Sequence, residues 1–451
     1  MKNKQLNLTS GPILSTLTEL ALPIMASSFL ATAYNITDMA WIGMLGSKAV
    51  AGVGVGGLYV WLSQGLCSLS RMGGQVNMAQ ALGRKDREAS IRYADVALQL
   101  TILFGLFFTA LCLFFTDPLL HFFNLTDPEA YASARVYMLI TCGLILLPYL
   151  TQTLTGLYTA QGDSKTPLKA NFLGLVLNMV LDPVLILGVG PFPRLEVVGA
   201  AAATVTSQFL VLAVLVVSLV KDHSETNILR HSNPLRRSAS SYYKDVFRIG
   251  IPTALQGTIY CLISMILTRM VSGFGAGAIA VQRVGGQIES LSWNTADGFG
   301  AALNAFMGQN YGARKTDRIR KGYSISFRLL VAWGLLITAA FVLIPGPISS
   351  LFFHEKDVVL ISIGYLTIIG FGEAFMSVEL MTIGALSGLG KTKLCSIISI
   401  IFTGMRIPLA MVLSATSLGL DGIWWALTAT SIVKGIIFYF AFQHISRRSL
   451  Y

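Results

Sequence analysis

The sequence is poor in charge. Only 12% of its 451 residues are Asp, Glu, Lys or Arg, whereas charged residues make up about a quarter of a typical soluble domain. Hydrophobic residues make up 54%. Such a chain cannot cover a surface that faces water, so most of it must face lipid. Lipid offers the backbone no hydrogen bonds, so only helices or closed barrels can cross a membrane.

Histidine and cysteine are scarce, with five of each. The cysteines stand singly in apolar runs without metal-binding spacing, which indicates small packing residues. A membrane-embedded enzyme would need a convergent catalytic set. The histidines instead lie at span ends or in loops: His121, His223, His231, His354 and His444. No GxxxxGK[ST] loop is present, which argues against direct use of ATP. We therefore expect no catalysis, no cofactor and, because Met1–Ser10 leads straight into a span, no cleaved signal peptide.

The net charge of +11 does not indicate a nucleic-acid partner. Most Lys and Arg residues lie between apolar runs, where they are typical of cytoplasmic loops. The apolar runs are long enough for helices of about 20 residues and too long for barrel strands. The sequence predicts an all-α integral membrane protein with about twelve transmembrane helices in two pseudo-symmetric six-helix lobes. The predicted spans are 14–40, 50–72, 92–116, 132–156, 168–189, 198–220, 248–272, 278–307, 324–353, 358–386, 394–416 and 422–445.

One polar stretch divides the chain. It predicts an amino-terminal lobe at 1–220, a basic cytoplasmic linker at 221–247 and a carboxyl-terminal lobe at 248–451. Strongly basic loops follow every even-numbered span, and the chain begins with Lys2 and Lys4. This alternation predicts a multi-pass protein of the cell membrane with both termini in the cytoplasm.

The two halves are similar in sequence. Pro23 in the first span matches Pro252 in the seventh at an offset of 252 − 23 = 229, and the same offset carries Gln80 onto Gln309. Six spans in each half make this a parallel repeat. Parallel repeats place substrate between two bundles near the membrane midplane, which is the plan of a transporter.

Several motifs together resemble the multidrug and toxic compound extrusion (MATE) family of transporters, over the whole chain and in both halves. They are Pro23 with Asp38 in the first span, Gln80–Gly83, Asn178-x-x-x-Asp182-Pro183, Gly199–Thr204, Gln309–Gly312 and Gly384–Thr392. The resemblance implies cation-coupled export, with the coupling ion bound in the amino-terminal half.

The residues themselves support an ion site in that half. A charged side chain inside a span costs about 2.5–3.5 kcal/mol, so it needs a partner or a watery cavity. Asp38 follows Tyr34 by one helical turn, and Asp182 follows Asn178 by four residues. With Thr204, these side chains offer the oxygen ligands of a hard cation such as Na⁺, or a carboxyl group that carries H⁺. The alternative is that both acids only join helices. We expect no other metal site.

The carboxyl-terminal half does not repeat this site, because Asp38 falls on Leu267 at the repeat offset. Its spans instead contain Glu289, Asp297, Glu373 and Glu379. In some relatives a seventh-span glutamate contributes a site here, but this chain has Gln256. We expect a substrate cavity lined by Glu289, Glu379, Gln256, Trp293 and Gln287. The alternative is that these acids form buried ion pairs, with Arg283 or Arg406.

The sequence therefore predicts a secondary exporter of lipophilic, cationic drugs or metabolites, driven by inward H⁺ or Na⁺ through alternating access. Its expected partners are this substrate and membrane lipid, and the two-lobe plan functions as a monomer. The alternative is a flippase for lipid-linked oligosaccharides. That function would need several cavity cations, whereas the mid-span charges are mostly acidic, apart from Arg269, Arg283, Arg406 and Lys434.

Overall fold

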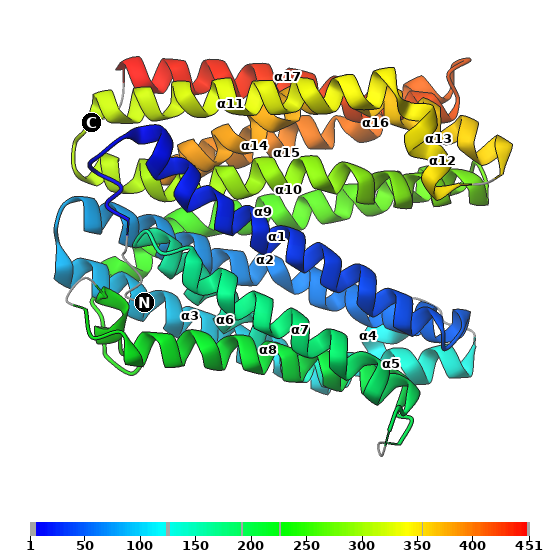
Figure 1. The fold of residues 1–451 in the computed structure, drawn as a ribbon, viewed down its shortest axis with the longest axis horizontal. Coiled ribbons are helices and arrows are strands. Elements are labelled where there is room, and N and C mark those ends of the chain that lie inside the picture. Colours follow the sequence, from blue (N-terminus) through cyan, green and yellow to red (C-terminus); the bar gives the residue numbers. More distant parts are fainter. Residues whose placement is uncertain (1–5, 123–126, 191–192, 225–226, 354, 449–451) are drawn as a thin grey trace. The chain divides into compact units, whose positions relative to one another are not determined.

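The computed structural model describes residues 6–122, 127–190, 193–224, 227–353 and 355–448. Every regular element in these ranges is a helix (Figure 1), which confirms the predicted fold class. Contacts divide the chain into two compact units. Of the described residues, unit 1 contains Leu6, Asn7 and the range Ala26–Ala254, and unit 2 contains Leu8–Met25 and the chain from Leu255 to Arg448.

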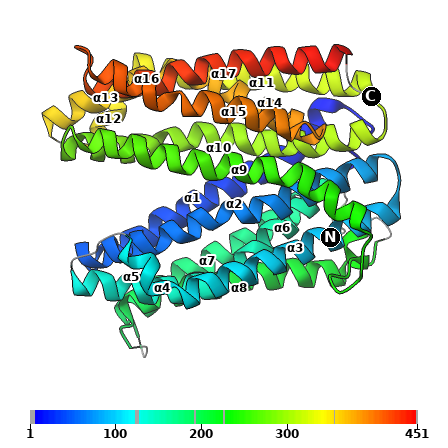
Figure 2. The same cartoon turned by 180° about the vertical axis from the view of Figure 1, so that it is seen from behind.

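The helices of the first half are α1 (Ile13–Gly43), α2 (Ser47–Gly83), α3 (Arg87–Phe114), α4 (Thr116–His121), α5 (Pro128–Gly143), α6 (Leu146–Ala160), α7 (Lys165–Leu187) and α8 (Glu196–Lys221). The short helix η1 (Ile228–His231) and α9 (Ser240–Ser272) follow. The remaining helices are α10 (Ala276–Gly312), α11 (Thr316–Leu343), α12 (Pro345–Phe352), α13 (Lys356–Gly370), α14 (Glu373–Gly388), α15 (Thr392–Gly404), α16 (Arg406–Ser414) and α17 (Leu420–Arg448). Figure 2 shows them from the other side.

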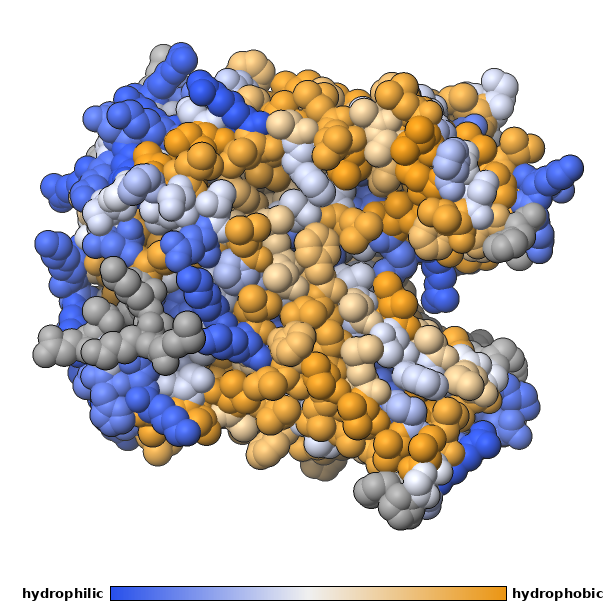
Figure 3. Space-filling model, in the orientation of Figure 1, coloured by the Kyte–Doolittle hydropathy of each residue, from blue (hydrophilic) through white to orange (hydrophobic). Residues whose placement is uncertain are grey.

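Among the described residues, nine helices are long and apolar enough to cross a membrane. Two bent pairs, α5 with α6 and α13 with α14, raise the number to eleven. Helix α10 lies at the predicted eighth span and is 37 residues long, but it carries Arg283, Glu289 and Asp297 and is not one of the eleven. In each unit hydrophobic side chains cover the middle of the helices, and hydrophilic ones gather at their ends (Figure 3).

The division into units follows the internal repeat. Membership changes inside α1 between Met25 and Ala26, and inside α9 between Ala254 and Leu255. The difference between these positions, 255 − 26 = 229, equals the repeat offset. The first turns of α9 belong to unit 1 because Gly250 of α9 lies against the backbone of Leu69 in α2. The lobes 1–220 and 248–451 and the linker 221–247 stay predictions, and the described part of the linker segment includes η1 and the start of α9.

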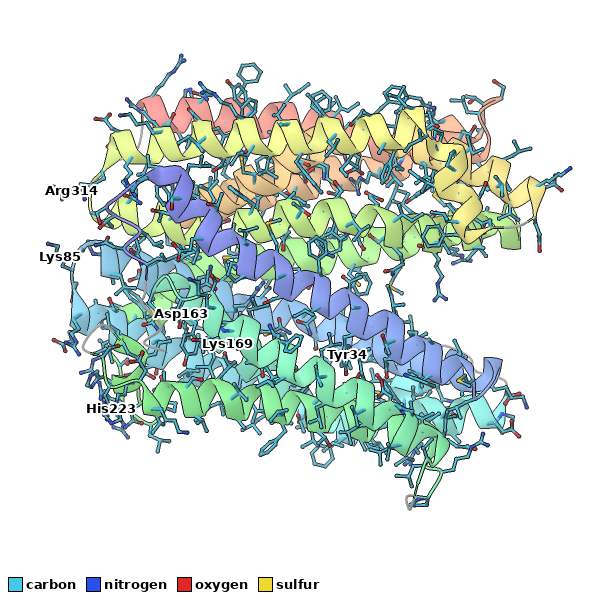
Figure 4. The ribbon with its side chains drawn as sticks, in the orientation of Figure 1. Tyr34, Lys85, Asp163, Lys169, His223 and Arg314 are labelled. Atoms are coloured by element: carbon cyan, nitrogen blue, oxygen red, sulfur yellow. The ribbon has the colours of Figure 1, made fainter. Side chains whose placement is uncertain are left out.

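The backbone repeats as well as the sequence. Lys85 after α2 has φ 61°, and Arg314 after α10 has φ 56°, at positions related by the same repeat offset (Figure 4). Left-handed backbone is costly for residues with a side chain. In this protein the left-handed residue ends a helix. The N–H of Lys85 donates to Leu82 O, and the N–H of Asp86 donates to Ala81 O. The corresponding bonds after α10 have the same spacing, so both helices end in a Schellman motif.

Both units also contain a broken span. The pairs α5–α6 and α13–α14 bend by 46° and 50°. In unit 1 the hydroxyl of Thr109 donates to the Cys142 carbonyl at this break, over 3.1 Å. In unit 2 the hydroxyl of Thr338 donates to Gly370 O, over 2.7 Å. The repeat offset also relates Thr109 to Thr338, so matched hydroxyls on α3 and α11 donate to a carbonyl at each break.

Candidate functional site

Unit 1 contains a cavity of about 440 Å³ between five of its helices. Polar side chains from α1, α2, α5, α6 and α8 line it together with apolar ones. The polar lining residues are Tyr34, Asn35, Asp38, Gln64, Tyr137, Thr141, Gln152, Thr204 and Gln208. A cavity with convergent polar groups inside an apolar bundle is the default location of a binding site.

Two carboxylates occupy this region. Asp38 of α1 is 7% exposed, and Asp182 of α7 is fully buried. The two carboxylates lie close enough to interact electrostatically. Asn178 donates its side-chain amide to Asp182 Oδ1 over 3.0 Å. Two acidic groups that share a buried site are poorly able to ionise together, so the site favours an added proton or cation.

Several oxygens in this site have no hydrogen-bond partner. They include Asp38 Oδ1, Asp182 Oδ2 and the amide oxygen of Asn178. Buried polar atoms are normally paired, so a cluster of unpaired ones requires an explanation such as a bound ion or a transferable proton. Carboxylate, amide and hydroxyl oxygens suit Na⁺ or H⁺ equally. Figure 4 shows Tyr34 on α1.

Local sequence explains how α7 and α8 meet beside this site. Asp182 precedes Pro183, which lies inside α7 and cannot donate a backbone hydrogen bond there. Gly199 of α8 lies against the carbonyl of Leu185, so close that a Cβ would come within 2.3 Å of its oxygen. The glycine therefore lets the two helices approach each other. Five residues further along α8, Thr204 reaches the cavity.

The structure brings the predicted ion-coupling residues together in unit 1. Asp38, Tyr34 and Thr204 line the cavity, and the bonded pair Asn178–Asp182 lies within electrostatic reach of Asp38. Their role in coupling remains a prediction. Among the described residues, no three His, Cys, Asp or Glu side chains are grouped so that they could hold a metal ion.

Unit 2 contains a buried ion pair. Lys434 Nζ of α17 lies 2.7 Å from Glu379 Oε1 of α14, and the two side chains are only 4% and 8% exposed. Arg406 does not pair with Glu379 and instead donates to the hydroxyls of Thr430 and Ser431, each over 3.0 Å. The charge of Glu379 is therefore neutralised within the protein.

Glu289 and Glu373 form a second acidic pair in unit 2. Tyr365 donates its hydroxyl to Glu289 Oε2 over 3.2 Å. Its ring reaches α10 because Gly285 has no Cβ, which would lie 2.2 Å from a ring carbon. Glu373, the first residue of α14, is 1% exposed, and its carboxylate lies near the hydroxyl of Ser292. Glu289 interacts electrostatically with Glu373 and with Arg406.

The other predicted cavity residues of unit 2 have different surroundings. Gln256 accepts a hydrogen bond from Ser396 over 3.3 Å. Gln287 is exposed, and Trp293 is 42% exposed. Their role as a substrate cavity, together with Glu289 and Glu379, remains a prediction.

Sequence reasoning misses two features. It places Lys434 within a span but does not pair it with Glu379, 55 residues away in sequence. It does not single out Arg71 of α2, although this residue lies within a predicted span. The Arg71 side chain lies against Gly156 of α6 beside Gln75, and its Nε is buried without a hydrogen bond. A charged residue within a predicted span is the available signal for both.

Comparison with known proteins agrees with this fold. The chain is 29% identical over 431 residues to a probable multidrug resistance protein NorM of Thermotoga maritima, covering 93% of this chain and 90% of that protein. It is 24% identical to an FAD transporter of Shewanella oneidensis, covering 99% and 97%. A crystal structure of MATE in the straight conformation superposes with a TM-score of 0.90 at 24% identity, covering 99% of both chains. Residues 23–184 and 252–412 match the MatE family. Because this match covers most of the chain and both of its halves, the protein is a member of the MatE family.

Proposed function

We propose that this protein exports lipophilic, cationic small molecules in exchange for inward H⁺ or Na⁺. The observation that carries the proposal is the buried pair of Asp38, which lines the unit 1 cavity, and Asp182, which lies within electrostatic reach of it, each with an oxygen that has no hydrogen bond. The similarity to a probable multidrug resistance protein supports the export of drugs. An ionisable group buried in a membrane protein is by default a functional group, because its burial is costly.

The coupling follows from electrostatics. With both carboxylates ionised, Asp38 and Asp182 repel each other and leave several oxygens unsatisfied. A proton or Na⁺ removes this repulsion and satisfies these oxygens, so ion binding favours a different arrangement of the surrounding helices. A ligand shifts a conformational equilibrium only by its difference in affinity for the two states. The inward ion gradient then supplies energy, about 2.3 kcal/mol for one charge across 100 mV.

We further propose that the protein lies in the cell membrane with both termini in the cytoplasm and acts as a monomer. The alternation of basic loops supports this orientation. The unit 1 cavity contains no Lys or Arg among its lining residues. A flippase for lipid diphosphates would need such cations, so this lining favours cationic substrates.

A second candidate substrate class is an anionic dinucleotide. The FAD transporter of Shewanella oneidensis aligns with 99% of this chain, and Arg71 provides a cation within α2. Guanidinium groups bind phosphates well because they donate in a planar fork. FAD competing with ethidium would support this class, and an absence of competition would leave the cationic class.

The test is uptake of ethidium, a cationic dye, into inside-out vesicles under an imposed H⁺ or Na⁺ gradient. We expect gradient-driven uptake by the wild type and its loss in Asp38→Asn and in Asp182→Asn. Glu129→Gln is the matched control, because Glu129 is an exposed acid of the same unit that pairs with Lys48. No uptake by folded wild-type protein with either ion would contradict the proposal. Uptake unaffected by Asp38→Asn would move the coupling site to unit 2.

A further inference from the structure

Residues 233–237, which lie between α8 and α9, are hydrogen-bonded to the side of α3. The backbone N–H of Asn233 donates to Asp95 Oδ1 over 2.6 Å, and the side chain of Asp95 is fully buried. Gln99, one helical turn further along α3, donates to the carbonyl of Arg236 over 2.7 Å. The Arg236 guanidinium lies 3.7 Å from Asp95 Oδ2. These contacts fix residues 233–236, which we call the linker turn. His223, which is labelled in Figure 4, lies two residues after the end of α8 and ten residues before the linker turn.

The linker turn presents a leucine at its tip. The carbonyl of Asn233 accepts from the N–H of Arg236 over 3.0 Å, and its side-chain oxygen accepts from the N–H of Leu235 over 2.9 Å. Asn and Pro in the first two positions favour such a turn. Leu235 is 90% exposed and thus makes almost no contact with the protein. A leucine at the tip of a turn is unusual because polar residues are common there, and Leu235 is the most exposed of the large hydrophobic residues in the described structure.

The position of the linker turn along α3 indicates what covers Leu235. After Asp95 the chain has no Asp, Glu, Lys or Arg until Asp117, a run of 116 − 95 = 21 residues. A helix needs about 20 residues to cross the hydrocarbon core. Asp95 therefore marks the edge of that core. Because Asn233 and Arg236 are bonded to Asp95 and Gln99, Leu235 lies at the boundary between hydrocarbon and headgroups.

The surroundings of Leu235 are basic. Residues 221–248 contain six cations, Lys221, Arg230, Arg236, Arg237, Lys244 and Arg248, against three carboxylates, Asp222, Glu225 and Asp245. Asp245 accepts a hydrogen bond from Tyr93 over 2.7 Å. On the facing α3, Glu88 is paired with Arg92 over 3.6 Å, and Arg92 also donates to the carbonyl of Arg237. Lys221, Arg230, Arg237, Lys244 and Arg248 are exposed. Cations at headgroup level attract anionic lipids.

We infer that the linker turn is a docking site for anionic phospholipids, with Leu235 among the upper acyl carbons and Arg230 and Arg237 at the phosphates. A leucine at the core edge flanked by arginines matches a lipid that is apolar on one side and anionic on the other. The depth of the turn favours lipid over a protein partner from the aqueous side. This site is separate from the ion site of unit 1 and does not depend on the proposed transport.

The test places an environment-sensitive fluorophore on Leu235→Cys in the full-length protein, in nanodiscs of phosphatidylcholine with or without phosphatidylglycerol. The five native cysteines are buried, so labelling is selective. Ala239→Cys, an exposed residue before α9 in the same segment, is the matched control. We expect a blue shift, and quenching by lipids spin-labelled near the headgroup, for position 235 and not for position 239. Both effects should be greater with phosphatidylglycerol and should weaken as salt is raised.

A second variant separates the charges from the leucine. Arg230→Gln with Arg237→Gln should remove the preference for phosphatidylglycerol and leave the thermal midpoint unchanged. A fluorophore at position 235 that stays in water in both membranes would overturn the inference. Equal burial in both membranes would also overturn it, because the site would then recognise no charge. Burial only after a cytosolic extract is added would identify a protein partner instead. Because the readout is fluorescence, a failed transport assay does not affect the result.

Discussion

Lys434 and Glu379 form an ion pair of 2.7 Å inside unit 2, with both side chains almost completely buried. The pair joins α17 to α14, two helices of the same unit. Breaking a buried pair by removing one partner is costly, because the other charge stays buried without compensation. Replacing both by apolar residues is often neutral.

We therefore expect Lys434→Met to lower the stability of the protein by about 3–5 kcal/mol. The double variant Lys434→Met with Glu379→Leu should recover most of this loss. The measurement is the thermal midpoint of purified protein in detergent. Equal midpoints for the wild type and Lys434→Met would show that the pair contributes little and that Glu379 is free to serve a substrate cavity.

Gly199 holds α8 close to α7 near Asp182. A Cβ at this position would lie 2.3 Å from the carbonyl oxygen of Leu185, and backbone cannot move aside as a flexible side chain can. We expect Gly199→Val to cost about 1–3 kcal/mol through overpacking and to reduce dye uptake, because Asp182 is displaced. Gly54→Ala in the same unit is the control, since nothing lies within 4 Å of its Cβ position. Normal dye uptake by Gly199→Val would show that the close contact between α7 and α8 is not needed to position Asp182.

Pro23 lies inside α1, two residues before the change of unit between Met25 and Ala26. Because proline removes a helix hydrogen bond, we expect it to ease bending at this point. Pro23→Ala should slow turnover in reconstituted vesicles more than it lowers substrate affinity. Pro252→Ala makes the corresponding change in α9. Unchanged turnover in Pro23→Ala would count against a role for this proline in the conformational switch.

Asp117 in the short helix α4 accepts hydrogen bonds from the Tyr131 hydroxyl over 2.9 Å and from Arg135 Nε over 3.0 Å. These hydrogen bonds lower the pKa of Asp117 below its ordinary value, and the bond from Tyr131 has the larger effect. A carboxyl group with a lowered folded-state pKa stabilises the fold above its unfolded pKa, and this stability is lost as the pH falls through the folded pKa.

We expect Asp117→Asn to lower the thermal midpoint slightly at neutral pH and to have no effect at a pH below both pKa values. Arg135→Gln should reduce the pH dependence without abolishing it, because the bond from Tyr131 remains. A difference between the wild type and Asp117→Asn that stays constant across the pH range would contradict this explanation.

Much of the fold was predictable because the membrane leaves few alternatives. Low charge and long apolar runs predict helices, since lipid cannot hydrogen-bond the backbone. The constant offset between matching positions predicts two similar halves, and the structure repeats it in the matched φ angles of Lys85 and Arg314. Part of the predicted ion site was also predictable, because a spacing of four residues puts Asn178 and Asp182 on one helical face. Asp38 lies on another helix, and its approach to this pair depends on how α1 packs.

Only the tertiary structure decided which charges meet. Glu379 pairs with Lys434, 55 residues away, and Glu289 meets Tyr365, 76 residues away. Periodicity gives the face of a helix but not the face that packs against it, so the partner of a buried acid depends on packing. The change of unit inside α1 and α9 also depends on packing. It follows from close backbone contacts such as that of Gly250 with Leu69, which a single sequence does not reveal.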